Sequence, residues 1–206
     1  MKNKKIILGI LISLFILHTV LALTNQIEKI DTWIYQTIIG LRSNNLDLYF
    51  KTITKLGNTI VIVFIIILLI ILLPKKQKKQ VLFSSLATIT VNLLVKNLLK
   101  RKRPNHLRLI KQGGYSYPSG HAMMSVAIYG YLLYLVVFYL KKKEIKYPTA
   151  ILLILIIVSI GISRIYLGVH YPSDIIGGYL LVSIIEIIIM SNKYFRGNTS
   201  DKNDCQ

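Results

Sequence analysis

Six long apolar runs, separated by short polar connections, dominate the pattern of this 206-residue chain. They cover residues 6–23, 59–73, 81–99, 122–140, 148–163 and 174–191. Most approach the roughly 20 residues that a helix needs to cross the hydrocarbon core of a bilayer. The pattern predicts an all-α, polytopic membrane protein with six transmembrane helices in one bundle. Because the runs use most of the chain, we expect a single membrane domain, residues 1–206, that ends in a polar cytoplasmic tail, residues 192–206.

The connection between the first two runs, residues 24–58, is amphipathic rather than uniformly polar. Its apolar residues recur at helical spacing in two stretches, Ile27, Ile30, Ile34, Ile38 and Leu41, then Leu46, Phe50, Ile53 and Leu56. This spacing predicts short helices that lie in the membrane interface, with Trp33 at headgroup depth. Packing of the same residues against neighbouring spans is the alternative, and the sequence leaves both open.

The composition agrees with a bilayer as the solvent of this chain. Hydrophobic residues make up 53% of the sequence and the mean hydropathy is +0.56, which a soluble domain of this size could not bury. The single Cys205 excludes an intramolecular disulfide. A lysine cluster precedes the first run, so a secretory signal is the alternative to a retained helix. The length of the run and the poor cleavage site at residues 22–24 favour the retained helix.

The formal net charge of +18 is scattered over short connections. Positive-inside bias and anionic lipid headgroups explain this distribution better than nucleic acid, which we do not expect as a partner. Alternation of six spans puts both termini and the lysine-rich connections, residues 75–79 and 141–146, on the cytoplasmic side. The count of Lys and Arg is 14 inside against 12 outside, or 14 against 9 without Lys96, Arg103 and Arg164. These three outer cations have a separate chemical reason for their place.

Lys96, Arg103 and Pro104 mark the end of the third run. On a helix, seven residues span about 10.5 Å along the axis, so Lys96 and Arg103 share a face. Pro104 then discourages further helix. A lysine inside a membrane span is costly and is a functional candidate, with snorkelling to the interface as the alternative.

The segment Pro118-Ser119-Gly120-His121 precedes the fourth run. Ser119 is a good helix N-cap and Gly120 permits close approach of a ligand to the backbone. The free N–H groups at a helix start form an anion site, which His121 would face. Simple capping is the alternative for so short a motif. His106 is a second candidate histidine, which we interpret as an exposed loop residue.

Arg164, His170 and Asp174 follow the fifth run. A guanidinium fork can bind two phosphate oxygens. A carboxylate four residues after His170 can hold the imidazole in one tautomer and leave the other nitrogen free to attack. A structural His–Asp hydrogen bond at a helix start is the alternative.

Three further positions carry structural predictions. Asn92, one turn before Lys96, is expected to form a hydrogen bond within the bundle. Glu186 lies twelve residues past Asp174, about 18 Å deeper along the helix, so it belongs to the inner interface or to a buried pair. The pair Gly177-Gly178 predicts close helix packing.

Together, the three segments resemble the signature of the type-2 phosphatidate phosphatase superfamily of membrane lipid phosphatases. That signature is Lys-x6-Arg-Pro, Pro-Ser-Gly-His and Ser-Arg-x5-His-x3-Asp, and the chain matches every position in order. The resemblance covers roughly residues 48–191, with Tyr117 in place of the usual Phe. It implies six spans, a bacterial member and a metal-independent hydrolase without a cofactor.

The resemblance also implies roles for the matched residues. His170 would be the nucleophile that forms a phosphohistidine, Asp174 would orient it, and His121 would be the general acid. Phosphate would be held by Lys96, Arg103, Arg164, Ser119 and Gly120. Several fixed donors around a phosphomonoester dianion agree with this chemistry, because charge stabilisation is usually the largest catalytic contribution.

The leading hypothesis is a membrane phosphatase that removes a terminal phosphate from a lipid at the outer face. Undecaprenyl diphosphate, phosphatidylglycerophosphate and phosphatidate share that phosphate and an anchored tail. An outward site slightly favours undecaprenyl diphosphate, whose carrier is recycled there. A lipid-dependent phosphotransferase would use the same residues, and an anion transporter would need a polar path that the second and fifth runs lack. The sequence does not predict the oligomeric state.

Overall fold

A computed structural model of the chain describes residues 2–104 and 107–192, and in this part it is helical without strands. The long helices are α1 (Lys2–Leu23), α5 (Lys75–Leu99), α8 (Lys143–Tyr166) and α9 (Pro172–Ser191). Another span runs without a break in the chain through α6 (Gly120–Ser125), the π-helical turn η2 (Val126–Gly130) and α7 (Tyr131–Tyr139). These five are long and apolar enough to cross a membrane.

The second predicted span, residues 59–73, is shorter than the others. Helix α4 (Thr59–Leu72) follows α3 (Asn44–Ile53) and the 3-10 turn η1 (Thr54–Gly57), and the two segments meet at a bend of 46°. Asn58 caps the start of α4, since its side chain accepts a hydrogen bond from the backbone N–H of Thr59. If the bent pair is counted as one span, the described chain has six candidate spans, and the predicted fold class is confirmed.

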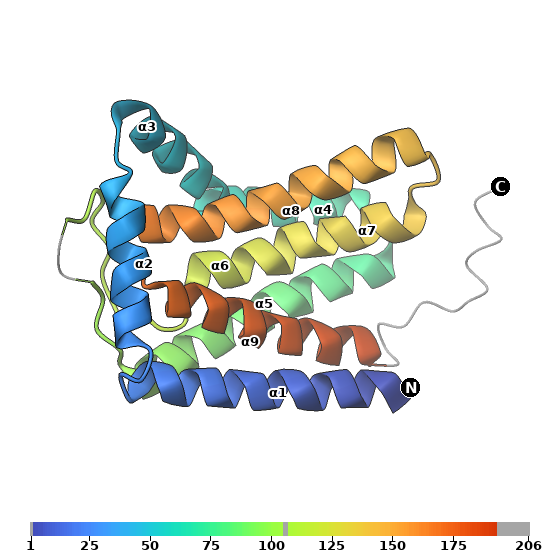
Figure 1. Cartoon of the computed structure of the whole chain (residues 1–206). Helices are drawn as coiled ribbons and strands as arrows, with labels where there is room; N and C mark the ends of the chain where they lie inside the picture. Colours follow the sequence, from blue (N-terminus) through green and yellow to red (C-terminus); the bar gives the residue numbers. More distant parts are fainter. Residues whose placement is uncertain (1, 105–106, 193–206) are drawn as a thin grey trace.

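The spans stack side by side as one bundle, with α1 on the outside against α9 (Figure 1). One apolar cluster joins α4, α5, η2, α7 and α8, and another joins α5, α6, η2 and α9. Large apolar side chains cover much of the outer surface, including Ile60 and Leu98, which are 80% and 79% exposed. A lipid-facing surface explains this exposure, because hydrocarbon chains rather than water would surround it.

Helix α2 (Glu28–Gly40) lies across one end of the bundle (Figure 1). The prediction of short helices in this connection is confirmed by α2 and α3. On α2, Trp33 is 68% exposed, whereas Asp31, Tyr35 and Ile39 are buried. The buried face of α2 therefore differs from the isoleucine stripe of residues 27–41 and carries a carboxylate.

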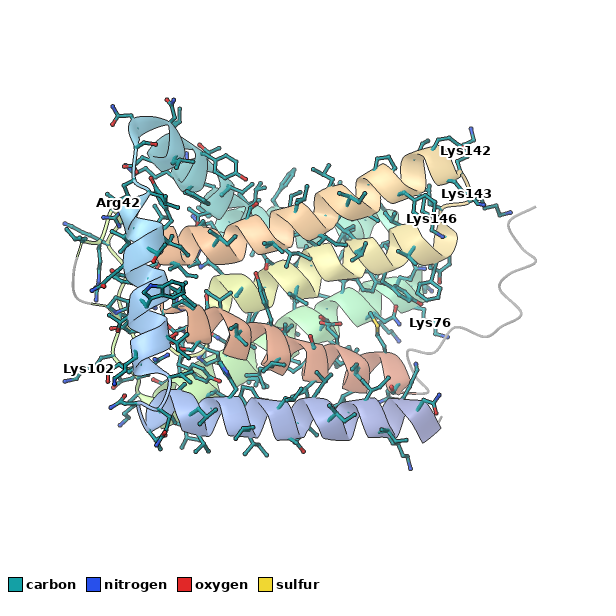
Figure 2. The ribbon with its side chains drawn as sticks, in the orientation of Figure 1. Arg42, Lys76, Lys102, Lys142, Lys143 and Lys146 are labelled. Carbon is teal, nitrogen blue, oxygen red and sulfur yellow. The ribbon has the colours of Figure 1, made fainter. Side chains whose placement is uncertain are left out.

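The two ends of the bundle have different loops. The start of α1, the end of α9, the turn between α4 and α5 and the turn between α7 and α8 share one end, opposite α2 (Figure 1). Lys76, Lys142, Lys143 and Lys146 lie at that end, whereas Arg42 and Lys102 lie at the α2 end (Figure 2). The lysine-rich connections are thus on the same end, as the alternation of six spans predicts.

Candidate active site

The three sequence segments meet at the α2 end of the bundle, because α5 and α8 end there and α6 and α9 begin there (Figure 1). One cavity of about 460 Å³ is lined by the predicted residues Lys96, Arg103, Gly120, His121 and His170. The remaining three predicted residues, Ser119, Arg164 and Asp174, are buried next to this lining. All eight predicted site residues are therefore in one place.

The imidazole of His170 lies between a carboxylate and a guanidinium. Its Nδ1 is 3.3 Å from Oδ2 of Asp174, and its Nε2 is 2.9 Å from Nη1 of Arg103. A guanidinium can only donate, so Nε2 accepts and carries the lone pair, and Nδ1–H donates to Asp174. The contacts thus define the tautomer with its lone pair at Nε2, the form that a nucleophile needs.

Burial keeps this imidazole neutral. His170 is 2% exposed, and burial, assisted by the Arg103 and Arg164 cations, lowers the pKa of His170 to about 3 despite the opposing effect of Asp174. An imidazole with this pKa is unprotonated at physiological pH. Its lone pair is occupied only by the hydrogen bond from Arg103, which an anion in the cavity can draw away.

Three cations at the cavity bond only to neutral acceptors in the described part of the chain. Lys96 donates to the carbonyls of Tyr115 and Ser116, at 2.9 and 3.4 Å. Arg103 donates to the carbonyls of Gly113, Gly114 and Val169 as well as to His170.

Arg164, 1% exposed, donates from its two terminal nitrogens to Thr54 and Gln112, and its buried Nε has no partner among the described residues. Three positive charges without a carboxylate partner in residues 2–104 and 107–192 make a strong anion site, because a buried cation is costly until an opposite charge pairs with it.

The segment Pro118-Ser119-Gly120-His121 is held from two sides. Ser119 caps α6 by accepting the N–H of Ala122 at 3.4 Å, and its own N–H donates to the backbone carbonyl of Asp174 at 3.0 Å. The side-chain amide of Asn92 donates to the carbonyl of Pro118 at 3.1 Å, which confirms its predicted bond within the bundle. The N–H groups at this helix start are thereby fixed at the cavity, where they can bind an anion.

Close packing of α9 fixes the same segment. A Cβ on Gly177 would lie 2.3 Å from the hydroxyl of Tyr117, and one on Gly178 would lie 3.1 Å from the carbonyl of Ser119. The prediction of close packing at the two glycines is confirmed, and it serves the approach of the Pro-Ser-Gly-His segment to α9.

His121 stands in the first turn of α6 and lines the cavity that His170 also lines. Its ring packs on η1, where a Cβ on Gly57 would lie 3.0 Å from Cδ2 of His121. No hydrogen bond to His121 is present within residues 2–104 and 107–192, so both ring nitrogens are available to a ligand. The alternative histidine, His106, lies outside the described residues.

Asp174 has more partners than the sequence suggests. Its Oδ2 also accepts the hydroxyl of Ser116, and the N–H of Tyr171 at 2.8 Å. Its Oδ1 accepts Nη1 of Arg101 at 2.7 Å. Ser116 and Arg101 were not predicted, because one lies in an irregular loop and the other is one of four consecutive basic residues.

Beyond the polar end, the cavity is apolar. Ile62, Val63 and Ile66 of α4 face Ile89 and Leu93 of α5 across it. Val63, Ile89 and Leu93 are also 47%, 44% and 54% exposed, so this wall continues onto the outer surface of the bundle. The site therefore joins a cationic pocket to an apolar opening between two membrane helices.

Glu186 lies away from the site, as predicted. It accepts a hydrogen bond from Ser84 on α5, deeper in the bundle. Of the two alternatives for Glu186, the structure shows the pair within the bundle, and this pair is partly buried.

A helical membrane-spanning fold with a His–Asp pair at one end, beside three cations that contact no carboxylate in the described chain, defines a class of phosphate-handling membrane proteins. The profile of the PAP2 superfamily matches residues 77–197. The chain belongs to this superfamily and is a phosphatase of it.

Two solved structures share the fold. The crystal structure of a transmembrane PAP2 type phosphatidylglycerolphosphate phosphatase from Bacillus subtilis superposes with a TM-score of 0.78 at 26% identity, covering 88% of this chain and 93% of that one. The structure of Aquifex aeolicus LpxE superposes with a TM-score of 0.64 at 28% identity, covering 77% and 92%.

Sequence comparison points the same way. Phosphatidylglycerophosphatase B of Bacillus subtilis (strain 168) is 28% identical over 191 residues, which are 86% of this chain and 92% of the relative. The decaprenylphosphoryl-5-phosphoribose phosphatase of Mycobacterium tuberculosis is 30% identical over 105 residues, 49% of this chain and 52% of the relative. The proteins that resemble this chain thus include phosphatases of different lipid phosphates.

Proposed function

We propose that this protein hydrolyses the terminal phosphate of a membrane lipid through a phosphohistidine on His170. The observation that carries the proposal is the imidazole between Asp174 and Arg103, with its lone pair directed at a cationic cavity. The phosphoryl group would displace the hydrogen bond from Arg103 and would be held by Lys96, Arg103 and Arg164. The backbone N–H groups at Ser119 and Gly120 would complete its binding site.

The reaction proceeds in two steps, phosphoryl transfer to His170 and hydrolysis of the phosphohistidine. First, Nε2 of His170 attacks phosphorus, the bond to the lipid oxygen breaks, and His121 gives its proton to that oxygen. Asp174 balances the positive charge that the phosphorylated imidazole carries. Second, water attacks phosphorus and gives its proton to His121, the P–N bond breaks, and inorganic phosphate leaves neutral His170 behind.

The apolar wall between α4 and α5 supports a lipid substrate. A diacyl or polyprenyl chain can remain in the bilayer against this wall while its headgroup enters the polar end of the cavity. We place phosphatidylglycerophosphate first among the candidates, because the relative that spans most of this chain is named for it. Undecaprenyl diphosphate and phosphatidate remain candidates, since both present a terminal phosphate on a membrane-anchored tail.

We also propose that the active site faces outward and that both termini are cytoplasmic. The lysine-rich end of the bundle supports this orientation by the positive-inside rule (Figure 2). Arg101, which contacts two carboxylates, adds a fourth outer cation with a structural reason for its place.

The test is phosphate release by purified protein in detergent, with EDTA present. The three lipids would be compared for wild type and for His170→Ala. We expect EDTA-resistant release that is lost in His170→Ala, with phosphatidylglycerophosphate hydrolysed most efficiently. Loss of lipid phosphate without free phosphate would instead identify a phosphotransferase, and activity in His170→Ala would refute the mechanism.

Orientation is tested separately with an impermeant thiol reagent on intact cells in a Cys205→Ser background. Lys111→Cys lies in an exposed loop at the active-site end, and Lys142→Cys is exposed at the other end. We expect the first to be labelled on intact cells and the second only after permeabilisation. The reverse result would overturn the outward site.

A further inference from the structure

Behind the catalytic pair, the guanidinium of Arg101 bridges two buried carboxylates. Its Nη1 is 2.7 Å from Oδ1 of Asp174, and its Nη2 is 2.8 Å from Oδ2 of Asp31. The side chains of Arg101, Asp31 and Asp174 are 13%, 4% and 0% exposed. Arg101 thus differs from the three cations of the cavity, because it already has anionic partners.

Ser173 joins the same group. Its hydroxyl accepts Nη1 of Arg101 at 2.7 Å and donates to Oδ2 of Asp31, while its N–H donates to Oδ1 of Asp31 at 2.9 Å. Asp31 therefore binds the start of α9 and Arg101 together. It reaches them from α2, whose opposite face exposes Trp33.

We propose that Arg101 and Asp31 are positioning residues that set the orientation and the effective charge of Asp174. This inference rests on the proposed phosphohistidine mechanism. It adds two residues that the three motifs do not specify to the machinery of the reaction, and it gives α2 a part in catalysis.

The charges of Asp31, Arg101 and Asp174 act on the imidazole together. When Nε2 of His170 carries the phosphoryl group, its ring is positive and depends on the negative charge of Asp174. Arg101 fixes Asp174 in place, but alone it would cancel that negative charge. Asp31 compensates Arg101, so the three groups together keep one net negative charge beside the imidazole. At the short range and low polarity of this buried site, such compensation has a large effect.

Stability alone does not account for the arrangement. A buried ion pair is costly to desolvate, and apolar residues of similar size often hold two helices together equally well. Here the buried charges of Arg101 and Asp31 act on Asp174, the carboxylate that contacts the nucleophile.

The experiment measures kcat and KM for phosphatidylglycerophosphate in Asp31→Asn, Arg101→Gln and the double variant. We expect Asp31→Asn to lower kcat about 10- to 100-fold, by analogy with the loss when a group that orients a metal-bound histidine is removed. KM should change less than about twofold, since Lys96, Arg103 and Arg164 are untouched. The double variant should recover part of the lost kcat, because removing both charges restores the single negative charge of Asp174.

Asp47→Asn is the matched control. Asp47 on α3 accepts the hydroxyl of Tyr166 at 2.7 Å, so it also fastens the 24–58 connection to the bundle, but without contact to Asp174. Its kcat should stay close to that of the wild type. A purely structural role of Asp31 predicts a double variant no better than Asp31→Asn, and that result would overturn the inference.

Two further comparisons keep the test decisive. If Asp31→Asn does not fold, the test compares kcat between Arg101→Lys and Arg101→Gln. The lysine keeps the positive charge and should retain the higher kcat. Equal kcat values in the two variants would overturn the inference. A wild type that forms no phosphoenzyme on His170 would reject the proposed function itself. Unchanged kcat in a folded Asp31→Asn variant, beside normal phosphoenzyme formation, would reject only the role of the positioning residues.

Discussion

Replacing Asp174 by Asn tests the chemistry of the His–Asp pair with a change of only one atom. Oδ2 of Asp174 accepts from His170, Ser116 and the N–H of Tyr171, and Oδ1 accepts from Arg101. Every one of these partners donates. An amide has one oxygen and one NH₂, so in either orientation it directs N–H groups at a donor.

The magnitude follows from what each orientation loses. With NH₂ toward His170, the imidazole is pushed to the tautomer protonated at Nε2, which has no lone pair for attack. With NH₂ toward Arg101, the tautomer survives but the imidazolium of the intermediate has no counter-charge. Hydrogen bonds to charged groups contribute roughly 1.5–3 kcal/mol each, and an equivalent carboxylate-to-amide change in the serine protease triad lowers kcat about 10⁴-fold. We expect kcat to fall about 10³- to 10⁴-fold, which corresponds to about 4–5.5 kcal/mol.

The assay is steady-state phosphate release from phosphatidylglycerophosphate, with kcat and KM determined separately. KM should remain near the wild-type value, because the phosphate-binding cations do not contact Asp174 in the described chain. Since Asp174→Asn also places an N–H against a buried donor, folding is checked by gel filtration and thermal unfolding. A folded variant whose kcat stays within tenfold of the wild type would refute the assigned role of Asp174.

Three further predictions concern other parts of the site. His170 is held neutral with its pKa lowered to about 3, so the folded state binds fewer protons than the unfolded state below pH 6.5. Its contribution to stability is therefore complete above pH 6.5 and is lost as the pH falls towards 3, by up to about 1.4 kcal/mol per pH unit. The unfolding temperature of the wild type should therefore fall more steeply with decreasing pH than that of His170→Gln. Parallel curves of unfolding temperature against pH would contradict this. Gly177→Ala should disrupt the Tyr117 contact, where the added Cβ would lie 2.3 Å from the hydroxyl, and should lower both thermal stability and kcat; Gly9→Ala, where nothing lies within 4 Å, is the control and should match the wild type. His121→Asn should slow phosphoenzyme formation from a lipid phosphate far more than from p-nitrophenyl phosphate, whose leaving group needs no proton, and an equal loss with both substrates in this step would argue against a general acid.

The spans could be predicted because their signal is local. Hydropathy located all six runs, since a lipid-facing helix is apolar on most of its surface. It missed the start of α5 at Lys75, six residues before the apolar run, because the lysines of the first turns extend into the polar end beside Pro74. The π-helical turn at residues 126–130 also has no signal in a uniformly apolar run.

Only the site residues that belong to the three motifs could be predicted from the sequence. Lys96, His121 and His170 stand at recognisable spacings at the ends of spans. The packing of the spans in one bundle brings these ends together. Asp31 is different, because its partners lie 70 and 142 residues further along the chain. Its place depends on how α2 crosses the end of the bundle, which no local pattern specifies. The amphipathic stripe of residues 27–41 predicted a helix there, but it gave no sign that the buried face would carry Asp31.

The most direct measurement is to trap the phosphoenzyme. Phosphatidylglycerophosphate labelled with ³²P in its terminal phosphate would be mixed with the purified protein, quenched rapidly in alkali and digested. A P–N bond to histidine survives alkali and is lost in acid, unlike a phosphoserine ester. The account predicts alkali-stable, acid-labile label on the peptide that contains His170, formed at least as fast as turnover and absent in His170→Ala. Label on another residue, or turnover without any label on His170, would contradict it.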